Sequence, residues 1–323
     1  MRVMLLHNAV ASDAAADERD VLVQVEAVGA ALAASGHDII TVPCGLDLET
    51  LMARLVAVRP DAVFNLVESL GGQGRLIAVV PHLLEALGVR HAGCPADAIH
   101  LTSHKILAKR LLLQAGLPTP AWVDEDRIVG DGGGDRWIVK SVWEDASLGL
   151  DDGAVTTGGP AAARALLAAR AGSAGSPWFA EAFVDGREFN LALLDGPDGP
   201  TVLPPAEMLF PDFPPDKPRI VGYAAKWDPE SFEYGHTVRA YPDGKTEGPM
   251  LAQLERRARE CWDLFGLRGW ARVDFRVDGA GRPYVLEVNA NPCLAPDAGF
   301  AAALDRADIS YTAAMVRILA AAG

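Results

Sequence analysis

A predicted β-hairpin near the C-terminus is the feature that most constrains the fold of this chain. Residues 270–292, WARVDFRVDGAGRPYVLEVNANP, carry β-branched and aromatic residues on both sides of a Gly-rich turn, which is typical of two antiparallel strands. A four-residue loop places Asp274 opposite Glu287 and Arg272 opposite Asn289 on one face. Two carboxylates this close repel each other unless a cation separates them, and Mg²⁺ prefers carboxylate and amide oxygens. The hairpin alone is equally compatible with a magnesium site and with a solvated polar face.

The composition restricts the kinds of protein that this chain can be. Its 323 residues suffice for two or three domains, and half of them are apolar, as in globular proteins. The net charge of −14 argues against a nucleic-acid-binding surface. No apolar run reaches the length of a membrane span and no signal peptide is evident, so we expect a cytoplasmic protein without a membrane partner. The four cysteines lack CxxC spacing, and Cys293 is either a pocket-lining or a buried thiol.

The first hundred residues alternate between predicted strands and helices. This alternation is the βαβ pattern of a parallel sheet. The turn after the first strand has no GxGxxG motif, so a dinucleotide site of the Rossmann type is not supported. Strands are expected at 3–6, 38–42 and 62–66, and helices at 20–35 and 49–58.

Three further segments are candidates for parts of a binding cleft. The Gly-rich turn 68–75 follows the third strand and is either a substrate-binding edge or a simple tight turn. The small polar turn 144–149 follows a strand that ends at Lys140, and it suits a flap whose backbone amides approach a phosphate. Six prolines fall within 204–218. We therefore predict that this stretch forms a lid and contains no central strand or helix.

A set of charged residues joins these segments to the hairpin. In chain order it comprises Lys105, Lys140, the Glu181–Val184 segment, Glu188, Lys226, Arg272, Asp274, Glu287 and Asn289. With the ARVDF and LEVNANP motifs, this set resembles the ATP-grasp superfamily, and within it the D-alanine–D-alanine ligase branch, over nearly the whole chain. The resemblance implies an α/β ATP-grasp fold. An N-terminal parallel domain (1–100) would precede central (101–180) and C-terminal (181–323) α+β subdomains that sandwich ATP.

The resemblance implies metal-binding and catalytic roles for the hairpin residues. Asp274, Glu287 and Asn289 would hold two Mg²⁺ ions beside the ATP phosphates. Arg272 would stabilise the oxyanion that forms when an amine attacks an acyl phosphate. Lys226 would contact the γ-phosphate and take part in catalysis.

The resemblance also implies a nucleotide site. Lys105 and Lys140 would contact the α- and β-phosphates, and Glu188 the ribose hydroxyls, although Lys105 and Glu188 are also residue types that commonly lie in solvent. The adenine edge would meet the backbone of Glu181, Ala182 and Val184. The flap from Glu144 to Gly149, which includes Ser147, would cover the phosphates.

The sequence departs from the family at its substrate positions. The serine of the family's flap falls at Ala146, the tyrosine after its loop lysine falls at Trp227, and a glutamate that completes their triad falls at Asp20. The serine that receives the second D-alanine's carboxylate falls at Ala298, beside Asp297. Loss of hydrogen-bond donors from a binding site changes specificity strongly.

We therefore expect an ADP-forming carboxylate–amine ligase that acts through an acyl phosphate on amino-acid-like substrates other than two D-alanines. A D-alanine–D-alanine ligase with relaxed motifs and a non-catalytic ATP-binding protein are the alternatives. Asp20, Glu68 and Asp297 could face a cationic group, and Arg75 a carboxylate, or all four could be solvated loop residues. Trp227 is a further candidate substrate contact. The resemblance also suggests a homodimer.

Overall fold

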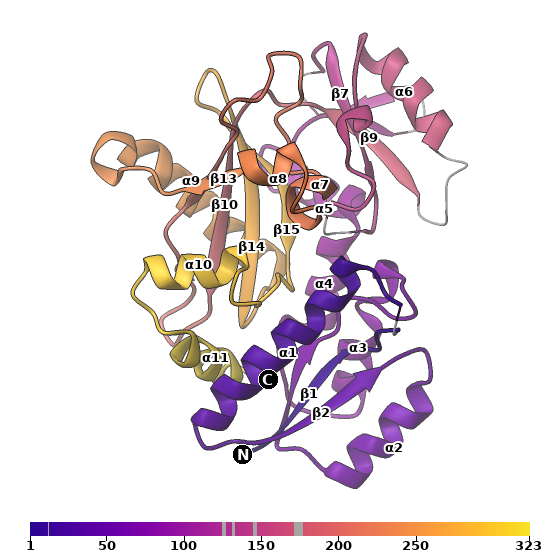
Figure 1. Cartoon of the computed structure of the whole chain (residues 1–323), viewed down its shortest axis with the longest axis vertical. Helices are drawn as coiled ribbons and strands as arrows, with labels where there is room; N and C mark the ends of the chain where they lie inside the picture. The colour runs from indigo at the N-terminus through magenta and orange to yellow at the C-terminus, as the bar shows by residue number, and fades with distance from the viewer. Residues whose placement is uncertain (12, 125–126, 131–132, 145–146, 171–176) are drawn as a thin grey trace.

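The computed structural model describes residues 1–11, 13–124, 127–130, 133–144, 147–170 and 177–323. These residues have the predicted α/β class and form three β-sheets with helices packed on them (Figure 1). The N-terminal sheet lies in the lower part of that view, and the other two sheets lie above it. No helix within the described ranges is both long and apolar enough to cross a bilayer.

The N-terminal sheet is parallel, as the alternation of strands and helices predicted, and both of its faces are covered. Its strand order is β2-β1-β3-β4. In the central strand, Val3 and Leu5 pack with α1, whereas Met4 and Leu6 pack with α2 and α3, because successive side chains point to opposite faces. The elements are β1 (Arg2–Asn8), α1 (Ala16–Ala34), β2 (Asp38–Cys44), α2 (Leu48–Val58), β3 (Ala62–Leu66), the short 3₁₀ helix η1 (Gly74–Leu76), α3 (Val79–Ala86) and β4 (His91–Ala92).

Two C-terminal helices, α10 (Gly299–Arg306) and α11 (Tyr311–Ala320), return to the N-terminal sheet. Helix α11 contacts α1 and β4, and its Met315 and Ile318 share a hydrophobic cluster with Val3 and Leu5. The core of the first hundred residues therefore includes residues from the other end of the chain.

The middle sheet has the order β6-β5-β9-β7-β8. Helix α6 covers one face, where Ala163 packs with Trp137 and Val139 of β7 and Ala180 of β9. Strand β9 ends at Ala182, two residues past the end predicted for the central subdomain at residue 180. The elements of this part of the chain are α4 (Ala96–Ser103), α5 (Lys105–Gln114), β5 (Trp122–Asp124), β6 (Arg127–Val129), β7 (Arg136–Ser141), η2 (Asp152–Ala154), β8 (Val155–Thr157), α6 (Gly159–Arg170) and β9 (Trp178–Ala182).

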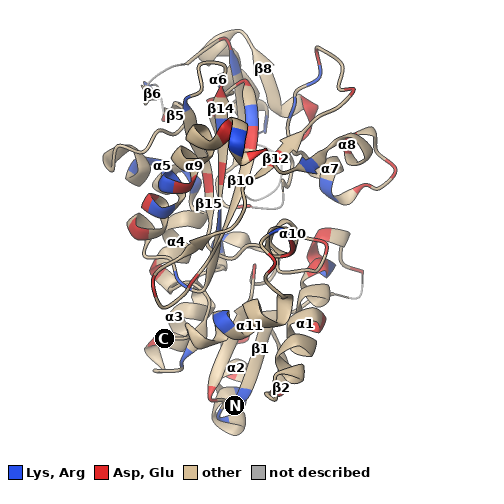
Figure 2. Ribbon diagram, turned by 90° about the vertical axis from the view of Figure 1, so that its left-hand side faces the viewer, with Lys and Arg blue, Asp and Glu red and all other residues tan. Residues whose placement is uncertain are grey.

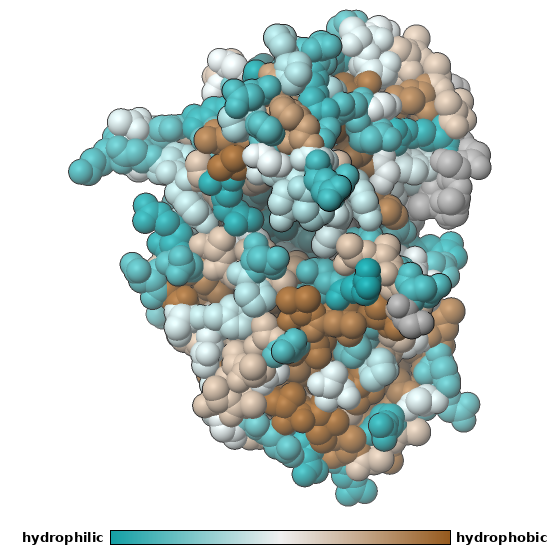
Figure 3. Space-filling view, in the orientation of Figure 1, coloured by the Kyte–Doolittle hydropathy of each residue, from teal (hydrophilic) through white to brown (hydrophobic). Residues whose placement is uncertain are grey.

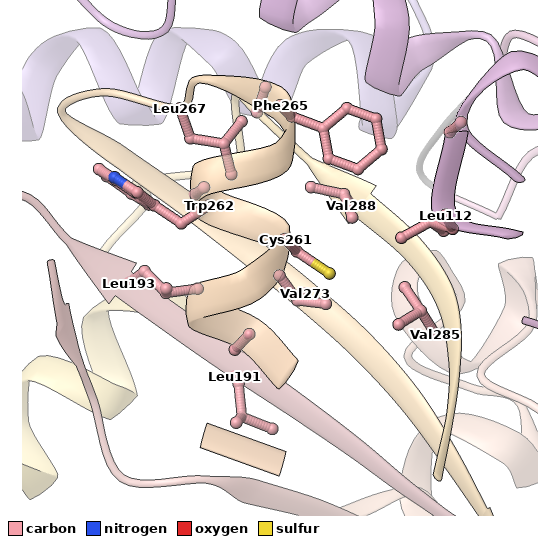
Figure 4. Packing of buried hydrophobic residues seen from close by; sticks show 14 of the residues in the cluster. Leu112, Leu191, Leu193, Cys261, Trp262, Phe265, Leu267, Val273, Val285 and Val288 are labelled. Carbon is pink, nitrogen blue, oxygen red and sulfur yellow. The ribbon is translucent and has the colours of Figure 1, made fainter. Parts of the chain in front are cut away.

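The C-terminal sheet has the order β13-β12-β10-β14-β15, with β11 beside β10. Helix α9 covers one of its faces (Figure 4), where Cys261 and Phe265 pack in one cluster with Leu191, Val273 and Val288 of the strands. The opposite face is left for the cleft described below. The elements are β10 (Gly186–Leu194), β11 (Thr201–Val202), β12 (Ala206–Leu209), α7 (Tyr223–Trp227), α8 (Phe232–His236), β13 (Val238–Ala240), α9 (Gly244–Phe265), β14 (Trp270–Asp278) and β15 (Pro283–Asn289).

The prediction that residues 204–218 contain no central strand was wrong. Strand β12 lies between β10 and β13. Pro205 immediately precedes the first residue of β12, and Pro211 lies two residues after its last. None of the four β12 residues is therefore a proline. Proline removes the backbone donor at its own position, and a short strand fits between two such positions.

The predicted pairing in the hairpin is confirmed at its functional end. Asp274 pairs with Glu287, and Arg272 with Asn289. Nearer the turn the register differs by one residue from a four-residue loop, because the register shifts after Asp274 and leaves Leu286 as an extra residue on β15. A bulge of this kind redirects side chains locally, and both Leu286 and Glu287 line the cleft.

Candidate active site

A cleft of about 680 Å³ lies between the three sheets, and Figure 3 shows a hollow between the upper and lower parts of the molecule. Arg75 does not line this cleft; it is exposed and donates to Gln73 Oε1 at 3.0 Å, so its predicted role as a carboxylate ligand is not supported. The other predicted site residues line the cleft: Asp20, Glu68, Lys105, Lys140, Glu144, Ser147, Glu181, Ala182, Val184, Glu188, Lys226, Trp227, Arg272, Asp274, Glu287, Asn289 and Asp297.

The strand pairing explains why the hairpin residues share one face. Asp274 pairs with Glu287 on one side and with Asn190 of β10 on the other. Two residues away, Arg272 pairs with Asn289 and with Ala192 in the same way. Directly paired residues point to the same face of a sheet, and this face is opposite to the one that α9 covers.

Arg272 holds the two carboxylates of the hairpin together. Its Nε and Nη2 lie 2.8 Å from Asp274 Oδ1 and Oδ2, and Nη2 lies 3.5 Å from Glu287 Oε1. Burial raises the pKa of Asp274 to about 6, although Arg272 opposes the change. Burial also acts to raise the pKa of Glu287, but the surrounding lysines and Arg272 outweigh it and lower that pKa to about 2.

The donor atoms of this site fit Mg²⁺. Asp274 and Glu287 offer carboxylate oxygens, and Asn289 offers an amide oxygen that also accepts from the backbone N–H of Asn291 at 2.9 Å. Hard oxygen donors of this kind suit Mg²⁺. Within the described residues, no three His, Cys, Asp or Glu side chains come together as a metal site, so a metal held by the hairpin depends on the Asn289 amide.

Three lysines surround the hairpin carboxylates. Lys105, Lys140 and Lys226 each act to lower the pKa of Glu287. Lys105 Nζ donates to a backbone carbonyl at the start of the predicted flap at 2.9 Å, and Lys140 Nζ lies 2.6 Å from Glu181 Oε1. Burial lowers the pKa of Lys226. This concentration of cations beside a carboxylate pair suits a polyphosphate with its metal ion.

A buried ion network lies behind Lys140. Glu181 is 1% exposed, and its second oxygen lies 2.7 Å from Lys109 Nζ, which also donates to Thr119 Oγ1 at 2.8 Å. Burial acts to raise the pKa of Glu181, but Lys109 and Lys140 outweigh it and hold that pKa below its usual range. The sequence prediction gave Glu181 a backbone role only and assigned no role to Lys109. Its position one helical turn after Lys105 was the signal that could have indicated a shared face.

Arg276 is a second residue that the sequence prediction missed. It is 3% exposed, and its Nη2 lies 2.8 Å from Glu188 Oε2. Its Nη1 donates to the backbone oxygens of Val184 and Gly186 at 3.3 and 3.4 Å. Arg276 thereby fixes both the carboxylate and the chain segment predicted to contact the ribose and adenine. Its position two residues after Asp274, on the same face of β14, could have indicated this.

The predicted flap meets the segment that follows the proline-rich stretch. Ser147 Oγ donates to the backbone oxygen of Val221 at 2.7 Å, and the Tyr223 N–H donates to that of Leu150 at 2.9 Å. Tyr223 Oη also donates to Asp17 of the N-terminal unit at 3.2 Å. These contacts close one side of the cleft, and Ala146 lies outside the described residues. A second cavity of about 570 Å³ lies beyond this contact and is lined by residues 148–153, by parts of the 213–224 segment and by Glu233. Of the predicted flap, Leu148 and Gly149 line it.

The predicted substrate acids lie at the N-terminal end of the cleft. Asp20 accepts from Cys293 Sγ at 2.9 Å, and Glu68 accepts from the Gln24 side chain at 2.8 Å. Burial raises the pKa of Asp20, and Asp297 adds to this effect. Cys293 therefore lines the cleft and donates to an acid there. In Figure 2 the acidic start of α1 lies near α10.

Comparison with known proteins identifies the relatives of this chain. Residues 137–320 match the family model described as the C-terminus of D-Ala-D-Ala ligase. A D-alanine–D-alanine ligase from Moorella thermoacetica is 33% identical over 315 residues, covering 90% of this chain and 93% of the relative. One from Halorhodospira halophila is 32% identical over 310 residues, covering 94% and 91%. The crystal structure of the Bacillus anthracis D-alanine–D-alanine ligase with ATP is 18% identical, covers 99% of this chain and 97% of its own, and has a TM-score of 0.74. The expected ATP-grasp fold is thereby confirmed.

Proposed function

This chain belongs to the D-alanine–D-alanine ligase family, and we propose that it is an ADP-forming ligase that joins the carboxylate of one amino-acid-like substrate to the amine of another. One observation carries the proposal. Arg272, Asp274, Glu287 and Asn289 share one face of the hairpin, and lysines from separate parts of the chain surround them in a single cleft. The ATP in the Bacillus anthracis structure supports ATP as the co-substrate of this chain.

The proposed reaction has two steps. A carboxylate oxygen of the first substrate attacks the γ-phosphorus of ATP, the bond from that phosphorus to ADP breaks, and an acyl phosphate forms. The amine nitrogen of the second substrate then attacks the acyl carbon. The carbon–oxygen bond to phosphate breaks, phosphate leaves with the electron pair, and a proton leaves the nitrogen for the departing phosphate.

The residues of the cleft have defined roles in this proposal. Lys105 and Lys140 bind the α- and β-phosphates, and Lys226 the γ-phosphate. Arg272 directs its donors at the oxyanion that forms during amine attack. Asp274, Glu287 and Asn289 hold Mg²⁺, which neutralises phosphate charge when bound.

The nucleotide and the cover of the site complete the assignment. Glu188, fixed by Arg276, accepts from the ribose, and the backbone of Glu181, Ala182 and Val184 meets the adenine. The contact between Ser147 and Val221 keeps the flap closed, which excludes water that would hydrolyse the acyl phosphate.

Two substrate assignments remain, each favoured by an observation. Ala298 and Trp227 supply no hydroxyl to the cleft, and Asp297 adds a negative charge there, which favours a pair of substrates other than two D-alanines. The names of the relatives that are about one-third identical favour D-alanine for both positions. Asp20 and Glu68 are candidate contacts of the ammonium group in either case. A homodimer stays a prediction.

The experiment is an ADP-release assay with MgATP, D-alanine and a panel of amino acids and amines, with products weighed by mass spectrometry. A product equal to two panel members minus water, formed together with ADP, supports the ligase and names its substrates. D-alanyl-D-alanine as the product favours the second assignment. Arg272→Ala is expected to lower kcat by roughly 100- to 1,000-fold while ATP binding, measured by calorimetry, is retained. Arg282→Ala is the matched control, because Arg282 lies at the exposed hairpin turn and pairs with Asp278.

A nucleotide-binding protein without ligase activity predicts a different result. ATP would bind, no mixture in the panel would release ADP, and Arg272→Ala would have no turnover to remove.

A further inference from the structure

We propose that Arg239 binds the carboxylate of the amine-bearing substrate and so restricts that substrate to amino acids with a free carboxylate. This inference rests on the ligase function proposed above and assigns a specificity residue to it. Arg239 lies on the edge strand β13 and lines the same cleft as the hairpin carboxylates. It belongs to none of the motifs by which the sequence was interpreted.

The register of the sheet places Arg239 on the active face. Arg239 pairs with Met208 of β12, Met208 pairs with Glu188 of β10, and Glu188 pairs with Arg276 of β14. Directly paired residues point to one face. Arg276 and Asp274 share that face because they are two residues apart on β14. Arg239 therefore belongs to the same surface as the predicted metal and nucleotide residues, at its far edge.

The side chain of Arg239 extends from this edge to the start of α10. Its Nη2 lies 3.5 Å from the position that a Cβ atom at Gly299 would occupy. Asp297, Ala298 and Gly299 all line the cleft at this point. Ala298 precedes the helix and makes no side-chain hydrogen bond to it. The Arg239 guanidinium thus supplies hydrogen-bond donors beside Ala298, whose side chain has none.

Among the described residues, Arg239 differs from Arg272 and Arg276 in that its guanidinium has no carboxylate partner. Arg272 is paired with Asp274, and Arg276 with Glu188. Within the described part of the chain, Arg239 makes no hydrogen bond or ion pair. A half-buried guanidinium with unused donors is suited to a planar anion, and its fork matches a carboxylate in a bidentate geometry.

The position of Arg239 distinguishes a substrate carboxylate from the phosphates of ATP. Strand β13 is three strands from β14, which corresponds to roughly 14 Å at the usual spacing of strands. The lysines that surround Glu287 are gathered at the hairpin, whereas the Arg239 guanidinium lies beside the start of α10. An anion at Arg239 is therefore a second group, away from the phosphates, and in an amide-forming ligase the carboxylate of an incoming amino acid is such a group.

The test compares wild type, Arg239→Ala and Arg239→Lys on matched pairs of amine substrates. The probes are D-alanine, L-alanine and glycine, each with its carboxamide, supplied with MgATP and assayed for ADP and for product mass. Arg239→Ala is expected to lower kcat/KM for the free amino acids roughly 10- to 100-fold, to leave the carboxamides within about threefold, and to leave KM for ATP unchanged. Arg239→Lys keeps the charge without the planar guanidinium fork, and its kcat/KM for the free amino acids is expected to lie between those of wild type and Arg239→Ala. Arg256→Ala, an exposed arginine on α9, is the matched control.

Binding of the same probes to the MgADP-loaded protein, measured by calorimetry, separates this inference from the proposed function. Amino acid binding that Arg239→Ala abolishes, without any ADP release from wild type, supports the carboxylate site and contradicts the ligase function. Turnover that is insensitive to Arg239→Ala supports the ligase and overturns the inference. A rise in KM for ATP in Arg239→Ala, or wild type that neither binds nor turns over any free amino acid, also overturns it. The melting temperature of each variant, expected within about 2 °C of wild type for an edge position, excludes unfolding as the cause.

Discussion

Glu181→Gln is expected to destabilise the protein more than Lys109→Met, although both substitutions remove the same buried ion pair. In Lys109→Met the Glu181 carboxylate keeps Lys140, whose Nζ lies 2.6 Å away. In Glu181→Gln the ammonium group of Lys109, a residue only 1% exposed, keeps Thr119 Oγ1 as a partner but loses its carboxylate. Replacing Glu181 is therefore expected to lower the free energy of unfolding more than replacing Lys109.

The magnitude follows from the burial of Lys109. An isolated charge left behind by a broken buried pair costs about 3–5 kcal/mol. The cost has a ceiling, because the lysine can lose its proton, and deprotonating an ordinary lysine at neutral pH takes about 4.6 kcal/mol. We expect Glu181→Gln to lower the free energy of unfolding by about 3–4.5 kcal/mol. Lys109→Met loses a charged hydrogen bond but also a buried charge, and we expect about 1–2 kcal/mol.

The pH dependence has a definite sign. Burial already lowers the pKa of Lys109, and without Glu181 the native state favours the neutral amine more strongly. The unfolded state then binds more protons than the native state, so the free energy of unfolding of Glu181→Gln rises with pH. The ceiling falls by about 1.4 kcal/mol for each pH unit, so at about pH 9 the destabilisation is expected to be at most about 2 kcal/mol.

Urea unfolding followed by tryptophan fluorescence measures these differences in the free energy of unfolding. Trp122 is a suitable probe because the centre of its ring lies 5.4 Å from Lys109 Nζ. Transition midpoints at constant slope are compared, because a chain with three sheets need not unfold in one step. The Lys109→Met/Glu181→Leu double variant, which removes both charges, is expected to recover most of the loss. Equal destabilisation by the two single variants, or no pH dependence for Glu181→Gln, would refute the reasoning.

Three further predictions concern the cleft. Glu287→Gln is expected to raise the Mg²⁺ concentration for half-maximal ADP release by about 100-fold or more, since a bound metal contributes several kcal/mol; an unchanged requirement would contradict the assignment of the hairpin. Gly222→Ala would place a Cβ 2.7 Å from the backbone oxygen of Leu150, and this clash is expected to separate the flap from the segment that it contacts. Water then enters and hydrolyses the acyl phosphate, so more ADP is released per amide formed. A ratio of ADP to amide equal to that of wild type would argue against closure at this contact. Ala298→Ser is expected to increase kcat/KM for D-alanine as the amine substrate by roughly tenfold. An unchanged kcat/KM would contradict a contact between the start of α10 and the amine substrate.

Local sequence patterns were sufficient for the elements whose contacts are near in sequence. The first three strands and the first two helices follow from their periodicity, and the hairpin pairing of Asp274 with Glu287 follows from the alternation of side chains around one turn. The bulge at Leu286 changed the register near the turn but restored the predicted pairs at the site. Register within a hairpin is set by few residues, so the sequence can specify it.

Contacts between distant segments were not predictable in this way. The proline-rich stretch was expected to lack a central strand, but pairing with β10 and β13 orders the residues between two prolines as β12. Such pairing depends on neighbouring strands and not on the local sequence. The contribution of α11 to the N-terminal core is of the same kind.

The sequence by itself determined the α/β class, the hairpin with its carboxylates, and the set of cations expected around a nucleotide. The tertiary structure alone decided which cations are paired and which are not. Lys109 is neutralised by Glu181 from β9, and Arg276 by Glu188 from β10. Arg239, at the edge of the C-terminal sheet, lies beside α10 without a carboxylate partner among the described residues. Charges interact through space over a few ångströms, and the residues that bring each charge its partner are separated by tens of positions along the chain.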